Sequence, residues 1–350
     1  MTLEELLKYT LDNGASDLHI TVGIPPTIRK NGRLEAVGNT KLLPADTEAL
    51  VRNMLSDEQW TNYNNIGELD LSFSFQGMGR FRANVYKQRG TYCAAIRMVN
   101  LNVPSMEQLG LPDIVGELSK KTKGLILVTG PTGSGKSTTL ASIIDSINYD
   151  RDCHILTLED PIEYLHRHNK SIVNQREIGN DTHSYASALR AALREDPDVI
   201  LVGEMRDIET IAIAVTAAET GHLVLSTLHT IGAANTIDRI IDVFPPHQQQ
   251  QIKVQLSSVI QGVISQQLIP RKDKPGRVAA IEVMVATPAI RNLIREGKTY
   301  QISSQLQTGA RFGMQTMDGS LANLYKRGLI TQEDALTHAA DQDNLMRFLG

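Results

Sequence analysis

Hydrophobic residues follow two different patterns along this chain of 350 residues. In the first hundred residues, apolar and polar positions alternate over short runs, which is typical of strands with one solvent-exposed face. These runs occupy residues 18–22, 26–29, 33–37, 68–75, 79–87 and 92–99. Helices are expected over 3–12 and 45–55, and Asn31-Gly32 predicts a hairpin turn. We therefore expect an α+β unit with a mostly antiparallel sheet.

From residue 124 onward the apolar runs are continuous instead of alternating, at 125–129, 155–158, 199–202 and 223–226. Helical patterns separate them, at 137–147, 185–194 and 208–219. Alternation of buried strands with helices predicts an α/β fold whose parallel sheet is covered on both faces. The last part of the chain, from residue 288 to 350, is predicted to be mostly helical.

The stretch 100–112 contains two prolines and little periodicity, which is typical of a linker. A chain of this length favours two domains over one. We therefore predict an N-terminal domain over 1–99, a linker over 100–112, and a C-terminal domain over 113–350.

Charge, cysteine content and the absence of long apolar runs argue against several classes of protein. The 35 basic and 39 acidic side chains give a net charge of −4, so no nucleic-acid partner is expected. Two isolated cysteines predict neither a disulfide framework nor a zinc site. The acidic N-terminus differs from a signal peptide, and no apolar run approaches the ~20 residues that cross a bilayer. We expect a cytoplasmic chain without direct membrane insertion, which reaches the membrane only peripherally or through a partner.

The strongest motif fits GxxxxGK[ST], between a predicted strand and a predicted helix. Its residues are Gly130, Pro131, Thr132, Gly133, Ser134, Gly135, Lys136, Ser137 and Thr138. Glycines let backbone N–H groups turn toward phosphates, and the start of a helix adds partial positive charge. Lys136 is expected to reach the β- and γ-phosphates of ATP, and the Ser137 hydroxyl to bind Mg²⁺.

A carboxylate follows another buried strand. Glu204 follows the run 199–202 after Gly203, and ligands bind at the carboxyl edge of a parallel sheet, so Glu204 is expected to activate the attacking water. Gly203 stands where an aspartate often holds magnesium, which suggests that Ser137, phosphates and water hold Mg²⁺. The alternative for Glu204 is a solvated loop carboxylate.

Other candidate residues are less specific. Glu159, Asp160 and Glu163 form an acidic run at a strand end, either supporting the site or simply solvated. His222 and His229 flank the run 223–228 and are either phosphate sensors or structural histidines. Arginines are candidates for stabilising transferred phosphate, especially when a neighbouring subunit supplies them. The candidates are Arg80, Arg82 and Arg97 in the first part, and Arg190 and Arg194, expected on one helical face.

Four sequence boxes together resemble the secretion-ATPase superfamily, which includes type II and type IV secretion and type IV pilus motors. The boxes are GPTGSGKST, LEDPIEY, LREDPDVILVGEMRD and TAAETGHLVLSTLHT. GASDLHI, GRFRANVYKQRG, AIRNLIREGK and QTGARFGMQTMD are similar to segments of the pilus-retraction branch. Extension and secretion relatives usually carry a four-cysteine zinc insert, which this chain lacks.

The resemblance implies a hexamer whose subunits combine a PAS-like N-terminal domain with a RecA-like C-terminal ATPase domain. It implies that Lys136 and Ser137 bind nucleotide and Mg²⁺, that Glu204 is catalytic with help from Glu163, and that Arg82 and Arg97 supply positive charge. It places His222 and His229 in a histidine box and associates AIRNLIRE with retraction. That last segment also has the spacing of an amphipathic helix.

The implied partners are an inner-membrane platform protein and, indirectly, the pilin fibre, with the ring lying at the inner face of the cytoplasmic membrane. The alternatives are an extension or type II secretion ATPase, an accessory retraction paralogue, a RecA-like nucleic-acid translocase, and a nucleotide-binding scaffold without turnover.

Overall fold

A computed structural model describes residues 1–75, 77–99 and 102–349. The first two residues of the expected linker, 100 and 101, lie outside this part of the chain, as do residues 76 and 350. Contacts divide the chain into two compact units. The first comprises Met1–Asn102 with Glu163–Leu165, and the second comprises Val103–Ile162 with His166–Gly350.

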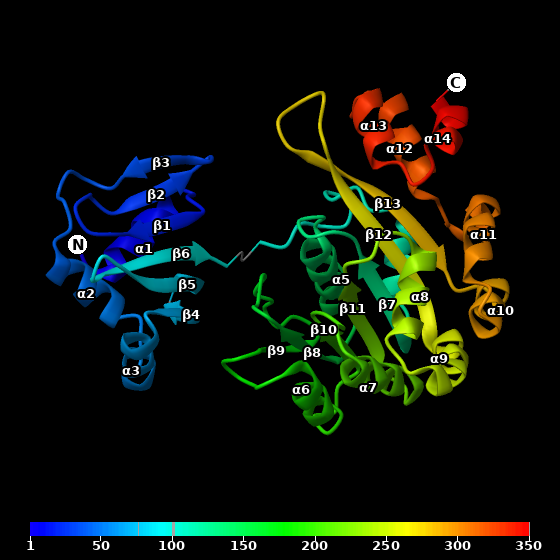
Figure 1. The fold of residues 1–350 in the computed structure, drawn as a ribbon, viewed down its shortest axis with the longest axis horizontal. Helices are drawn as coiled ribbons and strands as arrows, with labels where there is room; N and C mark the ends of the chain where they lie inside the picture. The colour runs from blue at the N-terminus through cyan, green and yellow to red at the C-terminus, as the bar shows by residue number, and fades with distance from the viewer. Residues whose placement is uncertain (76, 100–101, 350) are drawn as a thin grey trace. The chain divides into compact units, whose positions relative to one another are not determined.

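The first unit contains a six-stranded antiparallel sheet in the order β3-β2-β1-β6-β5-β4 (Figure 1). Its strands are β1 (Asp17–Ile20), β2 (Thr27–Lys30), β3 (Arg33–Ala36), β4 (Glu68–Phe75), β5 (Gly79–Gln88) and β6 (Thr91–Met98). Its helices are α1 (Leu3–Asp12), α2 (Pro44–Arg52) and α3 (Asp57–Ile66). The predicted α+β class with an antiparallel sheet is confirmed.

Apolar residues of the first sheet pack against leucines from the helices, such as Leu6 and Leu7 of α1 and Leu50 of α2. Polar side chains occupy alternate positions, as the period of two requires. Helix α3 was not predicted, although Ser56 caps its first turn in a capping box with Gln59 and Gly67 ends it.

The second unit contains a seven-stranded sheet in the order β13-β12-β7-β11-β10-β8-β9 (Figure 1). Its strands are β7 (Gly124–Thr129), β8 (His154–Glu159), β9 (Ile172–Glu177), β10 (Val199–Val202), β11 (Leu223–Leu228), β12 (Ile260–Pro270) and β13 (Arg277–Val285). Neighbouring strands pair in parallel, except that β13 runs antiparallel to β12. The predicted parallel sheet is confirmed.

Helices cover both faces of this sheet. The strands β7, β10 and β11 are therefore buried along their whole length. One face packs against α4 (Asp113–Ser119) and α5 (Lys136–Asp150). The other packs against α6 (Tyr185–Ala192), α7 (Ile208–Glu219), α8 (Ala233–Asp242), α9 (Pro246–Val259), α10 (Pro288–Glu296) and α11 (Ile302–Thr308). Helices α12 (Met317–Lys326), α13 (Gln332–His338) and α14 (Gln342–Leu349) form a third cluster with β12 and β13.

Further details of the second unit can be compared with the sequence prediction. Strand β9 and the β12–β13 hairpin were not predicted; in the hairpin, Gln266, Gln267 and Glu282 interrupt the apolar runs, and only the tertiary structure buries them. Helix α6 ends at Ala192, so the expectation that Arg190 and Arg194 share a helical face is wrong. The AIRNLIRE segment does form a helix, α10, with Ile290 and Ile294 buried. No helix among the described residues combines the length and the apolarity that a membrane span requires.

Candidate functional site

The phosphate-loop motif lies between the buried strand β7 and helix α5, as the sequence predicted. Gly130 has a φ of +141°, and a Cβ there would lie 2.2 Å from the carbonyl oxygen of Gln266. Gly135, the residue before α5, has a φ of +90°. Both positions therefore need glycine for their backbone conformation, and Gly130 needs it also because it packs closely against β12.

The first turn of α5 has no side-chain cap and no acidic residue. Its N–H groups and its partial positive charge thus remain available to an anion. By contrast, α6 is capped by Ser184 and α7 by Asp207. Ser137, in the first turn of α5, is exposed.

Lys136 is largely buried and folds back over the loop. Its Nζ donates hydrogen bonds to the carbonyl oxygens of Gly130, at 2.8 Å, and Pro131, at 3.1 Å. Burial lowers the pKa of Lys136, while the charge of Glu204 acts in the opposite direction. These carbonyls hold the ammonium group at the place where phosphate oxygens would replace them.

Glu204 follows β10 and lies at the carboxyl edge of the sheet with a side chain only 16% exposed. Its Oε1 accepts a hydrogen bond from Arg206 Nε at 2.7 Å and lies 3.2 Å from His229 Nε2. Burial acts to raise the pKa of Glu204, but Arg206 and His229 outweigh burial and lower it. The carboxylate is therefore ionised at neutral pH and available as a base.

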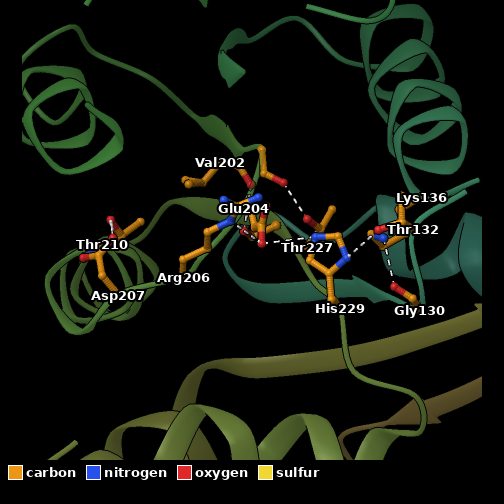
Figure 2. A network of polar contacts seen from close by, with 12 residues as sticks. Gly130, Thr132, Lys136, Val202, Glu204, Arg206, Asp207, Thr210, Thr227 and His229 are labelled. Carbon is orange, nitrogen blue, oxygen red and sulfur yellow. Dashed lines mark hydrogen bonds and ion pairs between the residues drawn. The ribbon is translucent and has the colours of Figure 1, made fainter. Parts of the chain in front are cut away.

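His229 connects this carboxylate to the phosphate loop (Figure 2). Its Nδ1 lies 3.5 Å from the Thr132 hydroxyl, and its Nε2 faces Glu204. A proton on Nε2 lets His229 donate to the carboxylate and leaves Nδ1 to accept from Thr132. One imidazole thus joins the ends of β10 and β11 with the loop after β7.

Hydrogen bonds between strand ends hold Glu204 in place. The N–H of Gly203 donates to Leu158 at 2.8 Å, and the Thr227 hydroxyl donates to the Gly203 carbonyl at 2.6 Å. A Cβ at Gly203 would lie 2.8 Å from the Tyr185 hydroxyl oxygen. An aspartate at this position would require Tyr185 to move, which explains why glycine occupies it.

The acidic run after β8 lies partly at the same edge. Glu159 accepts hydrogen bonds from Thr157, at 2.6 Å, and from Gln175, at 3.1 Å. Burial, together with the charges of Asp160, Glu204 and Glu159, raises the pKa of Tyr185 far above its ordinary value. Tyr185 thus presents a protonated hydroxyl among carboxylates.

Two hollows adjoin the loop and the carboxylate. The first, of about 490 Å³, is lined by Glu204, Arg206, His229, Thr230 and Arg239, with Met205 and Leu228. The second, of about 330 Å³, lies beside Gly135 and Thr138 and includes Leu109, Leu268 and Ala279. The first hollow suits a water molecule and phosphate, and the second offers apolar walls next to the loop.

Comparison with known proteins identifies the family of this chain. The pattern of type II/IV secretion system proteins matches residues 69–334. The chain belongs to this family. It is 49% identical to the type IV pilus retraction ATPase PilT of Pseudomonas aeruginosa, over 98% of this chain and 100% of the relative. It is 41% identical to the type IV pilus ATPase PilU of the same organism, over 99% of this chain and 90% of that protein.

A solved structure of the pilus retraction motor PilT with bound ADP superposes with a TM-score of 0.92. The two sequences are 51% identical, and the match covers 99% of each chain. The resemblance found from the sequence boxes is thus confirmed at the level of the family and of the fold.

Two of the predicted site residues, His222 and Arg190, do not lie beside the phosphate loop. His222 precedes β11, while the loop follows β7 at the other edge of the sheet, about 20 Å away along a six-residue strand. Its Nδ1 lies 2.9 Å from the Ala217 carbonyl oxygen, which fits the structural alternative for this histidine. Arg190 forms an ion pair with Glu209, between α6 and α7.

The predicted residues of the first unit form a group of their own. Arg82 and Arg97 are cross-strand partners on β5 and β6, so their side chains share one face of that sheet. Arg97 Nε donates to Asp17 at 2.8 Å. Glu163 also belongs to the first unit. The catalytic roles of Arg82, Arg97 and Glu163 stay predictions.

Sequence reasoning missed four residues that the structure places around the site: Tyr185, Arg206, Thr227 and Gln266. Arg206 was visible within the box that carries Glu204, two residues further on. Tyr185 and Gln266 come from elements far away in the sequence, and no local signal points to them.

The resemblance to this family implies bound magnesium, and the described residues offer few side-chain donors for it. Across the described residues, no group of three or more His, Cys, Asp or Glu side chains is arranged to hold a metal ion. Magnesium bound with a nucleotide needs only one or two protein oxygens besides phosphates and water. The exposed hydroxyl of Ser137 in the uncapped turn fits that requirement.

Proposed function

We propose that this protein is a homohexameric motor ATPase that couples ATP hydrolysis to the disassembly and retraction of type IV pili, and so drives twitching motility. The chemistry rests on one observation, the contact of Glu204 through His229 with the phosphate loop. The pilus role rests on the similarity to the retraction ATPase PilT over the full length of both chains.

ATP binding begins with an exchange of partners at Lys136. Its Nζ leaves the carbonyls of Gly130 and Pro131 and turns to the β- and γ-phosphates. The N–H groups of the loop and of the uncapped first turn of α5 surround the phosphate oxygens. When bound, Mg²⁺ neutralises charge on the β- and γ-oxygens, and Ser137 would hold it.

Hydrolysis then needs a base, and Glu204 is our candidate. The ionised carboxylate orients a water molecule and accepts its proton as the water oxygen attacks the γ-phosphorus, giving ADP and phosphate. Arg206 and His229 keep the carboxylate charged. His229 also contacts Thr132 of the loop, so the base and the phosphate cradle move together.

The nucleoside occupies the second hollow in this proposal. Leu268 and Ala279 offer apolar surface beside Gly135 and Thr138, where the first turn of α5 begins. An apolar slot next to the phosphate cradle is a common arrangement for a purine base.

The proposed motor keeps the domain division expected from the sequence, a PAS-like domain over 1–99, a linker over 100–112 and a RecA-like domain over 113–350. Arg82 and Arg97 of a neighbouring subunit supply positive charge to the transferred phosphate, and Glu163 assists Glu204. The ring lies in the cytoplasm, at the inner face of the cytoplasmic membrane, and acts on a platform protein embedded there.

Two measurements test this proposal. Purified protein is expected to hydrolyse ATP only when Mg²⁺ is present, and absence of hydrolysis would remove the motor function. Deletion of the gene in a piliated bacterium is expected to give hyperpiliated cells that do not twitch. A bald cell would instead indicate an extension motor.

A further inference from the structure

Two consecutive glutamines of β12 point to opposite faces of the strand. Gln266 is 2% exposed and Gln267 is 8% exposed. Gln267 donates a hydrogen bond to the carbonyl of His338, at the end of α13, at 3.1 Å. Gln266 faces the phosphate loop, so neighbouring residues of similar burial have different partners.

The side chain of Gln266 joins two parts of the nucleotide site. Its Nε2 donates to the carbonyl oxygen of Ser134 at 2.5 Å. Its Oε1 accepts from the hydroxyl of Thr139 at 2.8 Å. Ser134 belongs to the loop and Thr139 to the first turns of α5, and both are 2% exposed.

The bond to Ser134 determines where the next N–H points. In a trans peptide, the carbonyl of one residue and the N–H of the following residue point in opposite directions. Because the Ser134 carbonyl is held toward β12, the N–H of Gly135 points away from that strand. Gly135 has a φ of +90°, a conformation that glycine adopts without the strain that a Cβ would cause. The loop therefore gains its orientation from the glutamine.

We propose that Gln266 is a positioning residue that orients the Ser134–Gly135 peptide and the start of α5 before the nucleotide arrives. This inference rests on the proposed function, since it assumes that the loop binds the phosphates of ATP. Gln266 acts through Ser134 and Thr139, and it also lines the second hollow, so the test needs a readout in the absence of nucleotide. Donors that are already aligned spare the nucleotide the entropy of ordering the loop.

The chemistry of the position favours glutamine. A donor is needed for Ser134 and an acceptor for Thr139, and an amide of this length provides both. Glutamate would place an oxygen against the Ser134 carbonyl, and an apolar side chain would leave both groups buried without this partner.

The test compares Gln266→Met with Gln267→Met, two substitutions that keep the unbranched shape. For Gln266→Met we expect the Kd for ATP to rise about tenfold, because the loop and α5 lose their hydrogen bonds to this side chain. For Gln267→Met we expect a Kd within about twofold of wild type, although a hydrogen bond of similar burial is lost. Equal effects of the two substitutions on the Kd would overturn the inference.

Hydrogen exchange of the nucleotide-free protein provides a readout that does not depend on ATP binding. Amides of residues 134–139 are expected to exchange faster in Gln266→Met than in wild type or in Gln267→Met. Unchanged exchange in this segment would overturn the positioning role. If wild type itself fails to bind ATP, the proposed function falls, and hydrogen exchange still decides how the loop is held.

Thr139→Val covers the case in which Gln266→Met does not fold. It removes one of the two bonds and keeps the size of the side chain, so a rise of about threefold in the Kd for ATP is expected. Where Gln266→Met does fold, adding Thr139→Val to it should raise the Kd little further, because Gln266→Met already removes the contact with Thr139. Simple additivity, or an unchanged Kd in Thr139→Val, would overturn the proposal.

Discussion

The two sheets of this protein present their charged residues in different ways. In the second unit, both faces of the sheet are covered, and polar groups gather at the ends of its parallel strands. Glu204 is only 16% exposed and is held by Arg206 and His229. In the first unit, Arg97 lies on an uncovered position of the antiparallel sheet, and its side chain is 70% exposed.

The difference separates the groups that lie together within the second unit from the arginines that are only proposed to act on the site. The parallel edge holds the proposed base Glu204, the phosphate loop and the histidine that contacts both, all in the same unit. The first sheet holds cationic groups whose outer ends have room for another molecule: Arg97 is anchored at Nε by Asp17, and Arg82 lies beside it. Burial acts to raise the pKa of Asp17, but its bonds to Ser16 and Arg97 lower it, so the anchor stays charged.

The largest effect is expected at the preassembled edge, from Glu204→Gln. This change keeps the shape but removes the base, so kcat should fall about 100-fold or more while the Kd for ATP changes little. Steady-state phosphate release and nucleotide binding measure the two constants. Near-normal turnover would remove Glu204 from its role and with it the idea that this edge is complete.

The next effect concerns the exposed arginine. Arg97→Ala should lower kcat about tenfold or more, because a guanidinium stabilises the charge that develops on the transferred phosphate. The control is Arg33→Ala, at an exposed position of β3, which should leave kcat unchanged.

Mixing tests whether the arginine acts on a neighbour. In rings of Glu204→Gln and Arg97→Ala subunits in equal amounts, about a quarter of interfaces combine an intact Glu204 with an intact Arg97. Recovery of activity toward that fraction supports action between subunits. If the mixture stays as inactive as its parts, Arg97 works within its own chain or not at all.

A smaller change is expected from Arg206→Ala, which removes a partner of Glu204 and leaves its burial in place. The pKa of Glu204 should rise, because the hydrogen bond and the charge of Arg206 no longer lower it. Since the ionised form works, activity is present above this pKa and is lost as the pH falls through it. The acid limb of the kcat profile should therefore move to higher pH, with little change near neutrality. Arg239→Ala, in the same hollow, should keep the limb in its wild-type position.

The smallest effect on catalysis is expected from substitutions in α10, whose arginines affect stability instead. Arg291 makes structural hydrogen bonds, whereas Arg295 is exposed. Arg291 donates to the carbonyls of Ser257, at 2.8 Å, and Ser258, at 2.7 Å, at the end of α9. Arg291→Ala should cost about 1–3 kcal/mol of unfolding free energy. Exposed Arg295→Ala should cost less than about 0.5 kcal/mol. Thermal unfolding compares the two, and equal losses would contradict the structural role of Arg291.

Much of this fold follows from local sequence. Continuous apolar runs predicted β7, β8, β10 and β11, because a strand buried on both faces needs apolar residues at every position. The phosphate loop was equally clear, since its glycines and Lys136 stand within seven residues of one another. Helix α3 was missed despite its capping box.

Contacts between distant segments could not be predicted in this way. His222 and His229 belong to the same sequence box, yet the extended strand between them carries only His229 to the carboxyl edge. Tyr185 and Gln266 reach the site from α6 and β12, and nothing in their own neighbourhoods indicates a role.

The sequence by itself determined the chemistry available to this protein: an anion-binding turn, a carboxylate after a buried strand, and membership of a family. Only the tertiary structure decided which side chains hold these groups in place. The physical reason is that backbone conformation depends on neighbouring residues, whereas a hydrogen bond such as that from Gln266 to Ser134 joins residues 132 positions apart.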